Sequence, residues 1–168
     1  MKIYCKHLIH LLFPPRCPFC DGILLSSIFL PPKLVCDDCR GKLEYVGEPA
    51  CKKCGKPLED ERREYCFDCA RHAFDFAQGK ALWVYRGAVK ESIYRFKYHS
   101  RQEYAQFYGR ELVRVYGQWI KKRKIDALIP IPLSKRRLRR RGFNQAECIA
   151  REVTRQVTSG VTATAIAQ

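Results

Sequence analysis

Acidic residues are scarce in this chain of 168 residues, which has 17 Asp and Glu against 32 Lys and Arg and a formal net charge of +15. Such an excess of positive charge favours a polyanionic partner, such as nucleic acid, phosphate or pyrophosphate, and argues against a function for an acidic surface. The chain stays strongly basic even if eight of its cysteines bind two Zn²⁺ ions as thiolates.

A long uninterrupted apolar segment is also absent. The N-terminal apolar run is short, contains His7 and His10, and is not followed by a small-residue cleavage site. The sequence therefore indicates neither a signal peptide nor a membrane span. We expect residues 1–12 to form a helix that caps the next domain and ends at Pro14 and Pro15, and we expect the protein to be cytoplasmic.

Cysteine is rare in the second half of the chain and dense in the first. Eight of the ten cysteines form four Cys-x-x-Cys pairs, namely Cys17 with Cys20, Cys36 with Cys39, Cys51 with Cys54 and Cys66 with Cys69. Two such turns can point four thiolates at one cation, in the tetrahedral arrangement that structural zinc prefers. Redox chemistry would need one reactive pair in a strand-to-helix setting, so four pairs in series favour two zinc sites over redox pairs or disulfides.

The sequence leaves open which turns share a metal ion. Joining neighbouring turns closes the shortest loops and costs less chain entropy than joining the first turn with the third and the second with the fourth. We favour the consecutive scheme, which makes residues 13–75 a double zinc ribbon. Each ribbon has little apolar material, so we expect metal binding to drive its folding.

Residues 79–168 show the alternation of strands and helices that is typical of the start of an α/β domain. Apolar runs predict strands at 81–85 and 126–133, and Pro130 and Pro132 end the second of them. Apolar residues at helical spacing predict three helices. These helices are 89–98, a long helix that opens with a capping box of Ser100 and Glu103 and closes at Lys124, and 144–157.

A strongly basic segment lies between the second predicted strand and the last predicted helix. In open α/β sheets, ligands bind beyond the carboxyl ends of strands, and helix N-termini attract anions. Guanidinium groups bind phosphate in a bidentate way, and glycine lets the backbone approach a ligand. The candidate phosphate-binding or nucleic-acid-binding residues are Lys135, Arg136, Arg137, Arg139, Arg140, Arg141, Gly142 and Asn144. Three interpretations stay open: a phosphate or pyrophosphate loop, a patch for a nucleic-acid backbone, and a solvated basic loop.

Several motifs together resemble the ComF (ComFC) family. They are the four cysteine pairs, Tyr85-Arg86-Gly87, Arg95-Phe96-Lys97-Tyr98, Ile129-Pro130-Ile131-Pro132-Leu133 and Arg140-Arg141-Gly142-Phe143-Asn144-Gln145. The resemblance runs from about Leu12 to Val153 and implies an α/β fold, in which a double zinc ribbon precedes a type I phosphoribosyltransferase-like domain with a parallel sheet. It also implies a cytosolic protein that acts on incoming single-stranded DNA during natural competence and recognises phosphoribosyl pyrophosphate.

The chain departs from this family's pattern at residues 158–168. The family's phosphoribosyl pyrophosphate motif, an apolar strand ending in two acidic residues and followed by Thr-Thr-Gly, should come some tens of residues after the helix at 144–157. Carboxylates of that kind hold ribose hydroxyls and a catalytic Mg²⁺. We therefore expect residues 79–168 to be an incomplete domain, as in a fragment, a frameshifted product or a degenerate copy. We expect no turnover from it alone, with Mg²⁺ needed only by a longer enzyme.

Three functions follow as hypotheses. The first is a zinc-stabilised ComF-type protein that binds single-stranded DNA during uptake or recombination. The second is phosphoribosyl transfer to an unknown acceptor, with residues 135–141 holding pyrophosphate. The third is a zinc-ribbon module that docks competence or recombination proteins.

Overall fold

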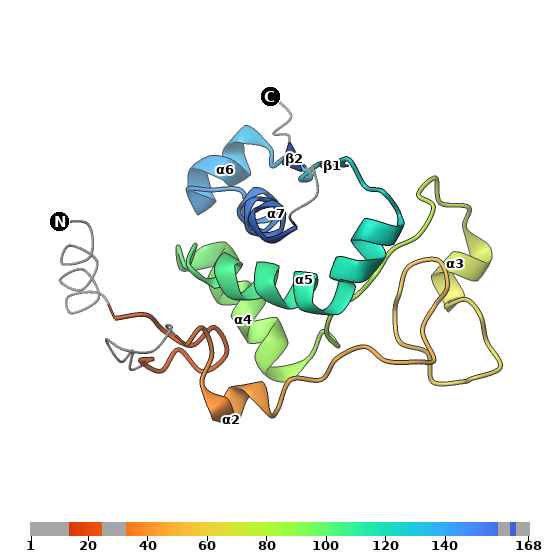
Figure 1. The fold of residues 1–168 in the computed structure, drawn as a ribbon, viewed down its shortest axis with the longest axis horizontal. Helices are drawn as coiled ribbons and strands as arrows, with labels where there is room; N and C mark the ends of the chain where they lie inside the picture. Colours follow the sequence, from red (N-terminus) through yellow and green to blue (C-terminus); the bar gives the residue numbers. More distant parts are fainter. Residues whose placement is uncertain (1–13, 25–32, 158–161, 164–168) are drawn as a thin grey trace.

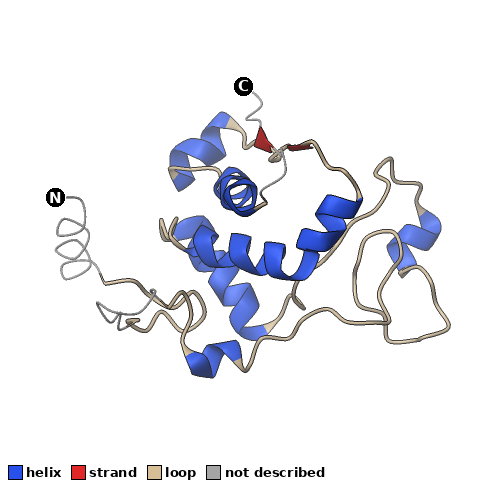
Figure 2. Cartoon of the chain, viewed as in Figure 1, coloured by secondary structure: helices blue, strands red, loops and turns tan. Residues whose placement is uncertain are grey.

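The computed structural model describes residues 14–24, 33–157 and 162–163 (Figure 1). Helices dominate these ranges, and their regular strands are two residues long (Figure 2). The elements in chain order are α2 (Asp37–Arg40), α3 (Phe67–Arg71), α4 (Gly87–Tyr98), α5 (Tyr104–Lys122), β1 (Ala127–Leu128), α6 (Lys135–Arg141), α7 (Gln145–Gln156) and β2 (Thr162–Ala163). The predicted helix at 1–12 lies outside the described residues. No helix of the described part is long and apolar enough to cross a membrane.

Helix α5 lies at the centre of the ribbon drawing and packs against α7 (Figure 1). The two helices approach closely at Gly109, where an added β-carbon would lie 2.5 Å from the β-carbon of Glu152. Any side chain at position 109 would therefore push α7 away from α5. Nearer the end of α5, Ile120 packs with Val153 and Val157 in a small apolar cluster.

The main hydrophobic core joins the first cysteine-rich segment to α4 and α5. Phe19 packs edge-on against Trp83 and Phe107, with ring centroids 5.8 and 5.6 Å away. Trp83 also stacks on Phe107 at 5.9 Å, and Phe96 of α4 lies 5.6 Å from Phe143, just before α7. Large aromatic side chains from separate parts of the chain thus hold these segments together.

The strands β1 and β2 pair in parallel, with Ala127 beside Thr162 and Leu128 beside Ala163. Helices α6 and α7 lie between them in sequence, which gives the long connection that a parallel pair needs. The predicted strand at 126–133 is wrong beyond Leu128, because Pro130 and Pro132 cannot donate ladder hydrogen bonds. Strand β2 lies within the stretch 158–168, where the sequence departs from the family's pattern.

Two other local predictions are also wrong. The segment 81–85 is no regular strand, because only Trp83 forms a β-bridge, with Tyr45. Its apolar character serves the aromatic core instead of a sheet. Ser100 does not cap α5, since its φ is 53° and the helix begins at Tyr104 without a side-chain cap.

Helices α4 and α7 lie where the periodicity predicts them. Asn144 caps α7 as expected, because its Oδ1 accepts a hydrogen bond of 3.0 Å from the Ala146 amide. The described architecture is therefore a mostly helical fold with one short parallel strand pair, preceded by two cysteine-rich segments.

Candidate metal centres and basic helix

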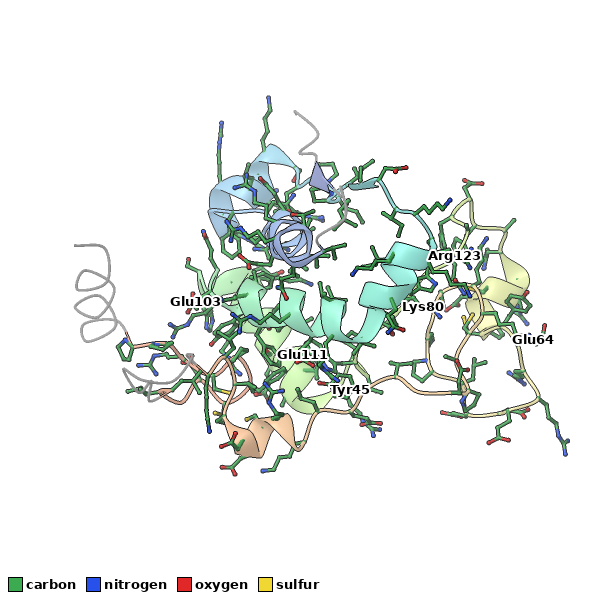
Figure 3. The ribbon with its side chains drawn as sticks, in the orientation of Figure 1. Tyr45, Glu64, Lys80, Glu103, Glu111 and Arg123 are labelled. Carbon is green, nitrogen blue, oxygen red and sulfur yellow. The ribbon has the colours of Figure 1, made fainter. Side chains whose placement is uncertain are left out.

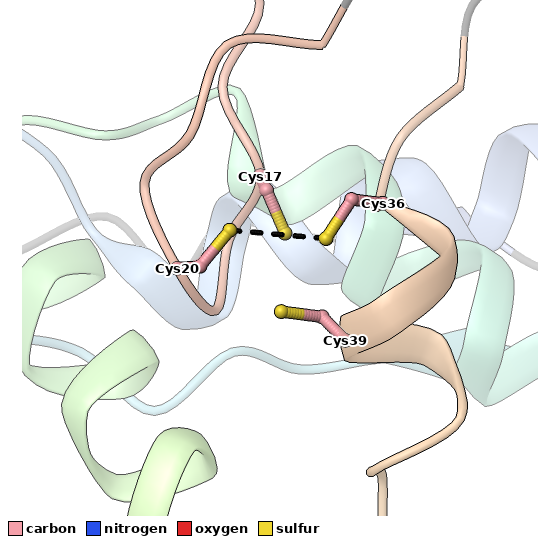
Figure 4. A group of neighbouring side chains, drawn as sticks. All are labelled: Cys17, Cys20, Cys36 and Cys39. Atoms are coloured by element: carbon pink, nitrogen blue, oxygen red, sulfur yellow. Dashed lines mark hydrogen bonds between the residues drawn. The ribbon is translucent and has the colours of Figure 1, made fainter.

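The first candidate metal centre gathers Cys17, Cys20, Cys36 and Cys39 (Figure 4). Backbone hydrogen bonds from Cys17 N to Gly22 O (2.8 Å) and from Asp21 N to Cys17 O (2.9 Å) shape the first pair's loop. Cys36 is the N-cap of α2 and Cys39 lies in that helix, so one short helical turn presents the second pair.

The second candidate centre, made of Cys51, Cys54, Cys66 and Cys69, repeats this construction. Cys51 and Cys54 lie on a tight turn, and Cys66 and Cys69 lie at the start of α3. Gly55 closes the turn at a φ of +75°, and a β-carbon there would lie 2.8 Å from the backbone nitrogen of residue 81. Glycine is therefore required at position 55 by both conformation and space.

Both clusters have dimensions that suit a tetrahedral zinc ion. The four sulfurs of each cluster lie within 4.8 Å of one another. Cys20 Sγ lies 3.8 Å from Cys36 Sγ, and Cys54 Sγ lies 3.7 Å from Cys66 Sγ. A Zn–S bond of about 2.3 Å places tetrahedral sulfurs about 3.8 Å apart. The clusters therefore fit two zinc sites, and neighbouring turns share a site as the shorter loops favour.

Backbone amides favour the thiolate at one cysteine of each cluster. Burial opposes ionisation of Cys17, but hydrogen bonds from the backbone of Cys36, Cys20 and Phe19 lower its pKa to about 7. Burial likewise opposes ionisation of Cys51, whose pKa falls to about 6 because backbone groups of Cys54, Cys66 and Lys53 bond to the sulfur. Hydrogen bonds to the charged form stabilise it, and the thiolate is the form that binds metal.

Three side chains outside the first ribbon hold its first turn in place. Tyr104 donates a hydrogen bond of 2.8 Å to Asp21, and Arg101 lies 3.2 Å from the same carboxylate. Arg95 of α4 donates to the carbonyl oxygen of Phe19. Burial, and then the hydrogen bond to Asp21, raises the pKa of Tyr104. The first candidate centre is therefore attached to α4 and α5 by polar contacts as well as by the core.

A second polar contact ties the segment after α2 to α5. The Tyr45 hydroxyl donates a hydrogen bond of 2.6 Å to the buried carboxylate of Glu111 (Figure 3). Arg114 donates to the same carboxylate, and Arg40 of α2 lies 3.8 Å from it. Burial alone would raise the pKa of Glu111, but the hydrogen bonds from Arg114 and Tyr45 lower it below its usual value.

The basic segment is helix α6, so its prediction as a loop is wrong. Ser134 caps the helix by accepting a hydrogen bond from the Arg137 amide, and Gly142 ends it at a φ of +77°. Arginine, lysine and leucine favour helix, and glycine adopts the left-handed C-terminal conformation at little cost. Gly142 therefore terminates a helix. A β-carbon added at this position would have no described atom within 4 Å, so no close backbone approach requires glycine there.

The six basic side chains of α6 carry uncompensated charge. Within the described residues, none of them forms an ion pair with a carboxylate. Five of the six are exposed, and Arg141 is half-buried. The six basic residues of α6 are Lys135, Arg136, Arg137, Arg139, Arg140 and Arg141. A helix that has this charge and no carboxylate partner among the described residues is suited to bind an anion.

Arg141 and Asn144 make specific contacts within the fold. Arg141 donates to Gln145 Oε1 at 3.1 Å and to the Tyr98 hydroxyl at 3.3 Å. Asn144 caps α7 and donates to the carbonyl oxygen of Ile131 at 3.1 Å, so both ends of its amide are engaged. The hydrogen bond from Arg141 lowers the pKa of Tyr98. Sequence analysis missed Tyr98 at this site, because it lies 43 residues from Arg141 and no local spacing joins them.

Comparison with known proteins identifies a family model for the cysteine-rich part of the chain and a relative whose similarity extends beyond it. A family model described as "Double zinc ribbon domain" matches residues 8–70. The competence protein ComFC of Bacillus subtilis (strain 168) is 30% identical over 147 residues, which cover 80% of this chain and 60% of that protein. These two matches support assigning the chain to the ComF family.

A second ComF relative gives a similar result. The competence protein ComFC of Streptococcus pneumoniae is 31% identical over 119 residues, covering 67% of this chain and 49% of the relative. The chain thus spans about half to three fifths of the length of these two proteins. No solved structure matches it.

Proposed function

We propose that each four-cysteine cluster of this ComF-family chain binds one Zn²⁺ ion and that the two ions build a double zinc ribbon. The donor set supports zinc, since four thiolates on two short turns form the usual closed structural site. The sulfur separations and the backbone amides aimed at Cys17 and Cys51 support it further. A closed site of this kind stabilises the fold and leaves no open position for catalysis.

We also propose that the chain binds single-stranded DNA through α6 during DNA uptake or recombination in the cytoplasm. The uncompensated positive charge of α6 is the observation that carries this proposal. Two further observations support it, namely the formal charge of +15 and the relatives' name, competence protein. Phosphates of a DNA backbone would release counterions on binding to such a helix.

The experiment is a titration of the full zinc-loaded chain with a labelled single-stranded oligonucleotide over a range of salt concentrations. Binding through phosphates predicts an affinity that falls steeply with salt. Changing Arg139, Arg140 and Arg141 together to Gln should weaken binding and reduce the salt slope by roughly 2, because each lost contact on a single strand accounts for about 0.7.

A matched control removes the same charge elsewhere. Changing Lys121, Lys122 and Lys124 to Gln deletes three positive charges at the end of α5 and leaves α6 intact. We expect this variant to bind nearly as tightly as the unmodified chain. Equal losses in the two triple variants would mean that net charge, and not α6, determines binding.

A second proposal concerns the scaffold that carries α6. We propose that residues 79–168 begin a type I phosphoribosyltransferase-like domain after the ribbons at 13–75, and that α6 recognises the pyrophosphate of phosphoribosyl pyrophosphate. The parallel pair β1–β2, with α6 directly after β1, supports this proposal. Calorimetric titration with phosphoribosyl pyrophosphate should show binding that ribose 5-phosphate does not reproduce, and equally weak binding of both would contradict it.

A further inference from the structure

Two tyrosines of α4 expose their rings on the side of the helix that lies near α6. Tyr94 and Tyr98 are 56% and 40% exposed, whereas Phe96 between them is buried. Their spacing of four residues places them on one face of α4, with ring centroids 4.9 Å apart and planes tilted by 50°. The rings therefore do not cover each other face to face, and each keeps open aromatic surface.

Guanidinium groups of α6 lie beside this pair. The Cζ atoms of Arg140 and Arg141 lie 5.2 and 5.1 Å from the centroid of the Tyr98 ring, which is cation–π distance. Arg141 also bonds the Tyr98 hydroxyl and is fixed from the other side by Gln145. The structure therefore holds two exposed tyrosine rings and two guanidinium groups together before any ligand arrives.

We infer that Tyr94, Tyr98, Arg140 and Arg141 form a stacking site for unpaired nucleobases of a single strand. The inference rests on the proposed binding of single-stranded DNA and adds the residues that recognise its bases. Every base has an aromatic face, and proteins that bind single strands combine such stacking with a positively charged track for the backbone. Bases of a duplex are stacked on each other, so their faces are not available to these tyrosines.

The other exposed aromatic residues of the described chain are less suited to a polyanion. Phe67, Phe74 and Phe76 lie in or just after the second ribbon and are exposed. The same ribbon carries several carboxylates, at Glu59, Asp60, Glu61, Glu64 and Asp68. These carboxylates offset the ribbon's own positive charges, for example in the ion pairs of Lys52 with Glu64 and of Lys56 with Asp68. The basic helix α6 beside the tyrosine pair of α4 forms no such pair within the described residues.

The test uses the full zinc-loaded chain and compares oligo(dT), an abasic strand of the same length and a duplex. Changing Tyr94 and Tyr98 together to Leu removes the rings and keeps apolar volume. Because stacking on an aromatic side chain is worth about 1–3 kcal/mol per base, we expect oligo(dT) affinity to fall roughly 10- to 100-fold. Affinity for the abasic strand and the duplex should stay unchanged, and so should the salt slope.

Two further variants separate loss of stacking from loss of folding. Tyr98→Phe keeps the ring and loses only the hydroxyl, so it should retain most of the oligo(dT) affinity. Tyr85→Leu changes another exposed tyrosine, which precedes α4, and should have no effect. Affinity for oligo(U) should fall in the double variant as affinity for oligo(dT) does, because a site that contacts only base faces does not select the sugar.

The outcomes separate this inference from the proposed function. Suppose that the unmodified chain binds oligo(dT) with a steep salt slope, that it binds the abasic strand as tightly, and that the double variant binds oligo(dT) with the same affinity. The stacking site is then refuted, and phosphate binding by α6 stands. If no single strand binds the unmodified chain, the proposed function fails as well. Equal loss of affinity for oligo(dT) and the abasic strand in the double variant would also overturn the inference, because it would show a defect unrelated to bases.

Discussion

The first ribbon, residues 14–42, and the second, residues 49–70, each contain two Cys-x-x-Cys pairs but differ in what surrounds these pairs. The first contributes Phe19, Leu24 and Val35 to the main hydrophobic core, together with residues of α4 and α5. Among the described residues of the second ribbon, none belongs to either hydrophobic cluster. In Figure 1 the second ribbon, with α3, lies to one side of α5, away from α4.

One phenylalanine inside a cysteine pair of each ribbon illustrates how differently the two ribbons are packed. Phe19, between Cys17 and Cys20, is 3% exposed, and Phe67, between Cys66 and Cys69, is 58% exposed. The same residue type, placed between the two cysteines of a pair, is thus a core residue in one ribbon and a surface residue in the other. Cysteine spacing determines where a metal binds, and the apolar residues around it determine whether the ribbon becomes part of the larger fold.

The largest expected effect comes from removing one metal centre at a time. Changing Cys36 and Cys39 to Ser should abolish cooperative unfolding of α4 and α5, because structural zinc contributes about 10–16 kcal/mol in small zinc-binding peptides. That exceeds or equals the whole stability of about 5–15 kcal/mol of a typical domain. Changing Cys66 and Cys69 to Ser should unfold only the second ribbon.

Circular dichroism during thermal unfolding, combined with amide hydrogen exchange, distinguishes these outcomes. The second variant should keep the exchange protection of α4 and α5, and the first should lose it. Equal loss of protection in the two variants would show that the ribbons contribute alike to the fold and would remove the difference described here.

A smaller effect is expected from the two phenylalanines. Phe19→Ala should lower the free energy of unfolding by about 3–5 kcal/mol, the usual cost of deleting a buried phenylalanine ring. Phe67→Ala should change it by less than about 0.5 kcal/mol, as at most surface positions. Urea denaturation of the zinc-loaded variants gives both values, and a cost at Phe67 comparable to that at Phe19 would mean that the second ribbon is packed in solution.

The smallest of these effects concerns the polar contact between Tyr45 and Glu111. Glu111→Gln should destabilise the protein by about 1–3 kcal/mol at pH 7, because hydrogen bonds to a charged group are lost. The folded-state pKa of Glu111 lies below its unfolded value, so its contribution is present above the unfolded pKa and is lost as pH falls through the folded one. The difference between variant and unmodified chain should therefore shrink below about pH 4.3.

Chemical denaturation of both proteins from pH 7 to pH 3 measures this difference. The comparison uses only those pH values at which both proteins keep their two metal ions, because loss of the first centre would itself unfold α4 and α5. A difference that stays constant over this range would show that the ionised form of Glu111 does not stabilise the contact.

Features that depend on local spacing could be predicted from the sequence. The four cysteine pairs identify both candidate metal centres, and shorter loops favour the consecutive pairing that the structure adopts. Helices α4 and α7 follow from apolar periodicity, and the cap by Asn144 follows from residue type. These features involve residues that are near each other in sequence, so a local pattern carries the information.

Features that depend on tertiary contacts could not be predicted. The apolar run around Trp83 is typical of a strand, but its side chains fill an aromatic core formed by distant segments. The partners Tyr45 and Glu111 are 66 residues apart, so no spacing rule joins them. Helix α6 is a different case, because its local signals are present in the sequence. Ser134 and Gly142 are ordinary start and stop signals of a helix, but dense positive charge is also typical of a ligand-binding loop.

Metal content is the most direct test of the claim that two thiolate centres build the N-terminal part of the chain. Elemental analysis of the purified protein should find two zinc ions per chain, and one in each of the two double-cysteine variants. The eight thiols should react with a thiol reagent only after chelation. A chain without zinc, or one with disulfides among these cysteines, would contradict the account.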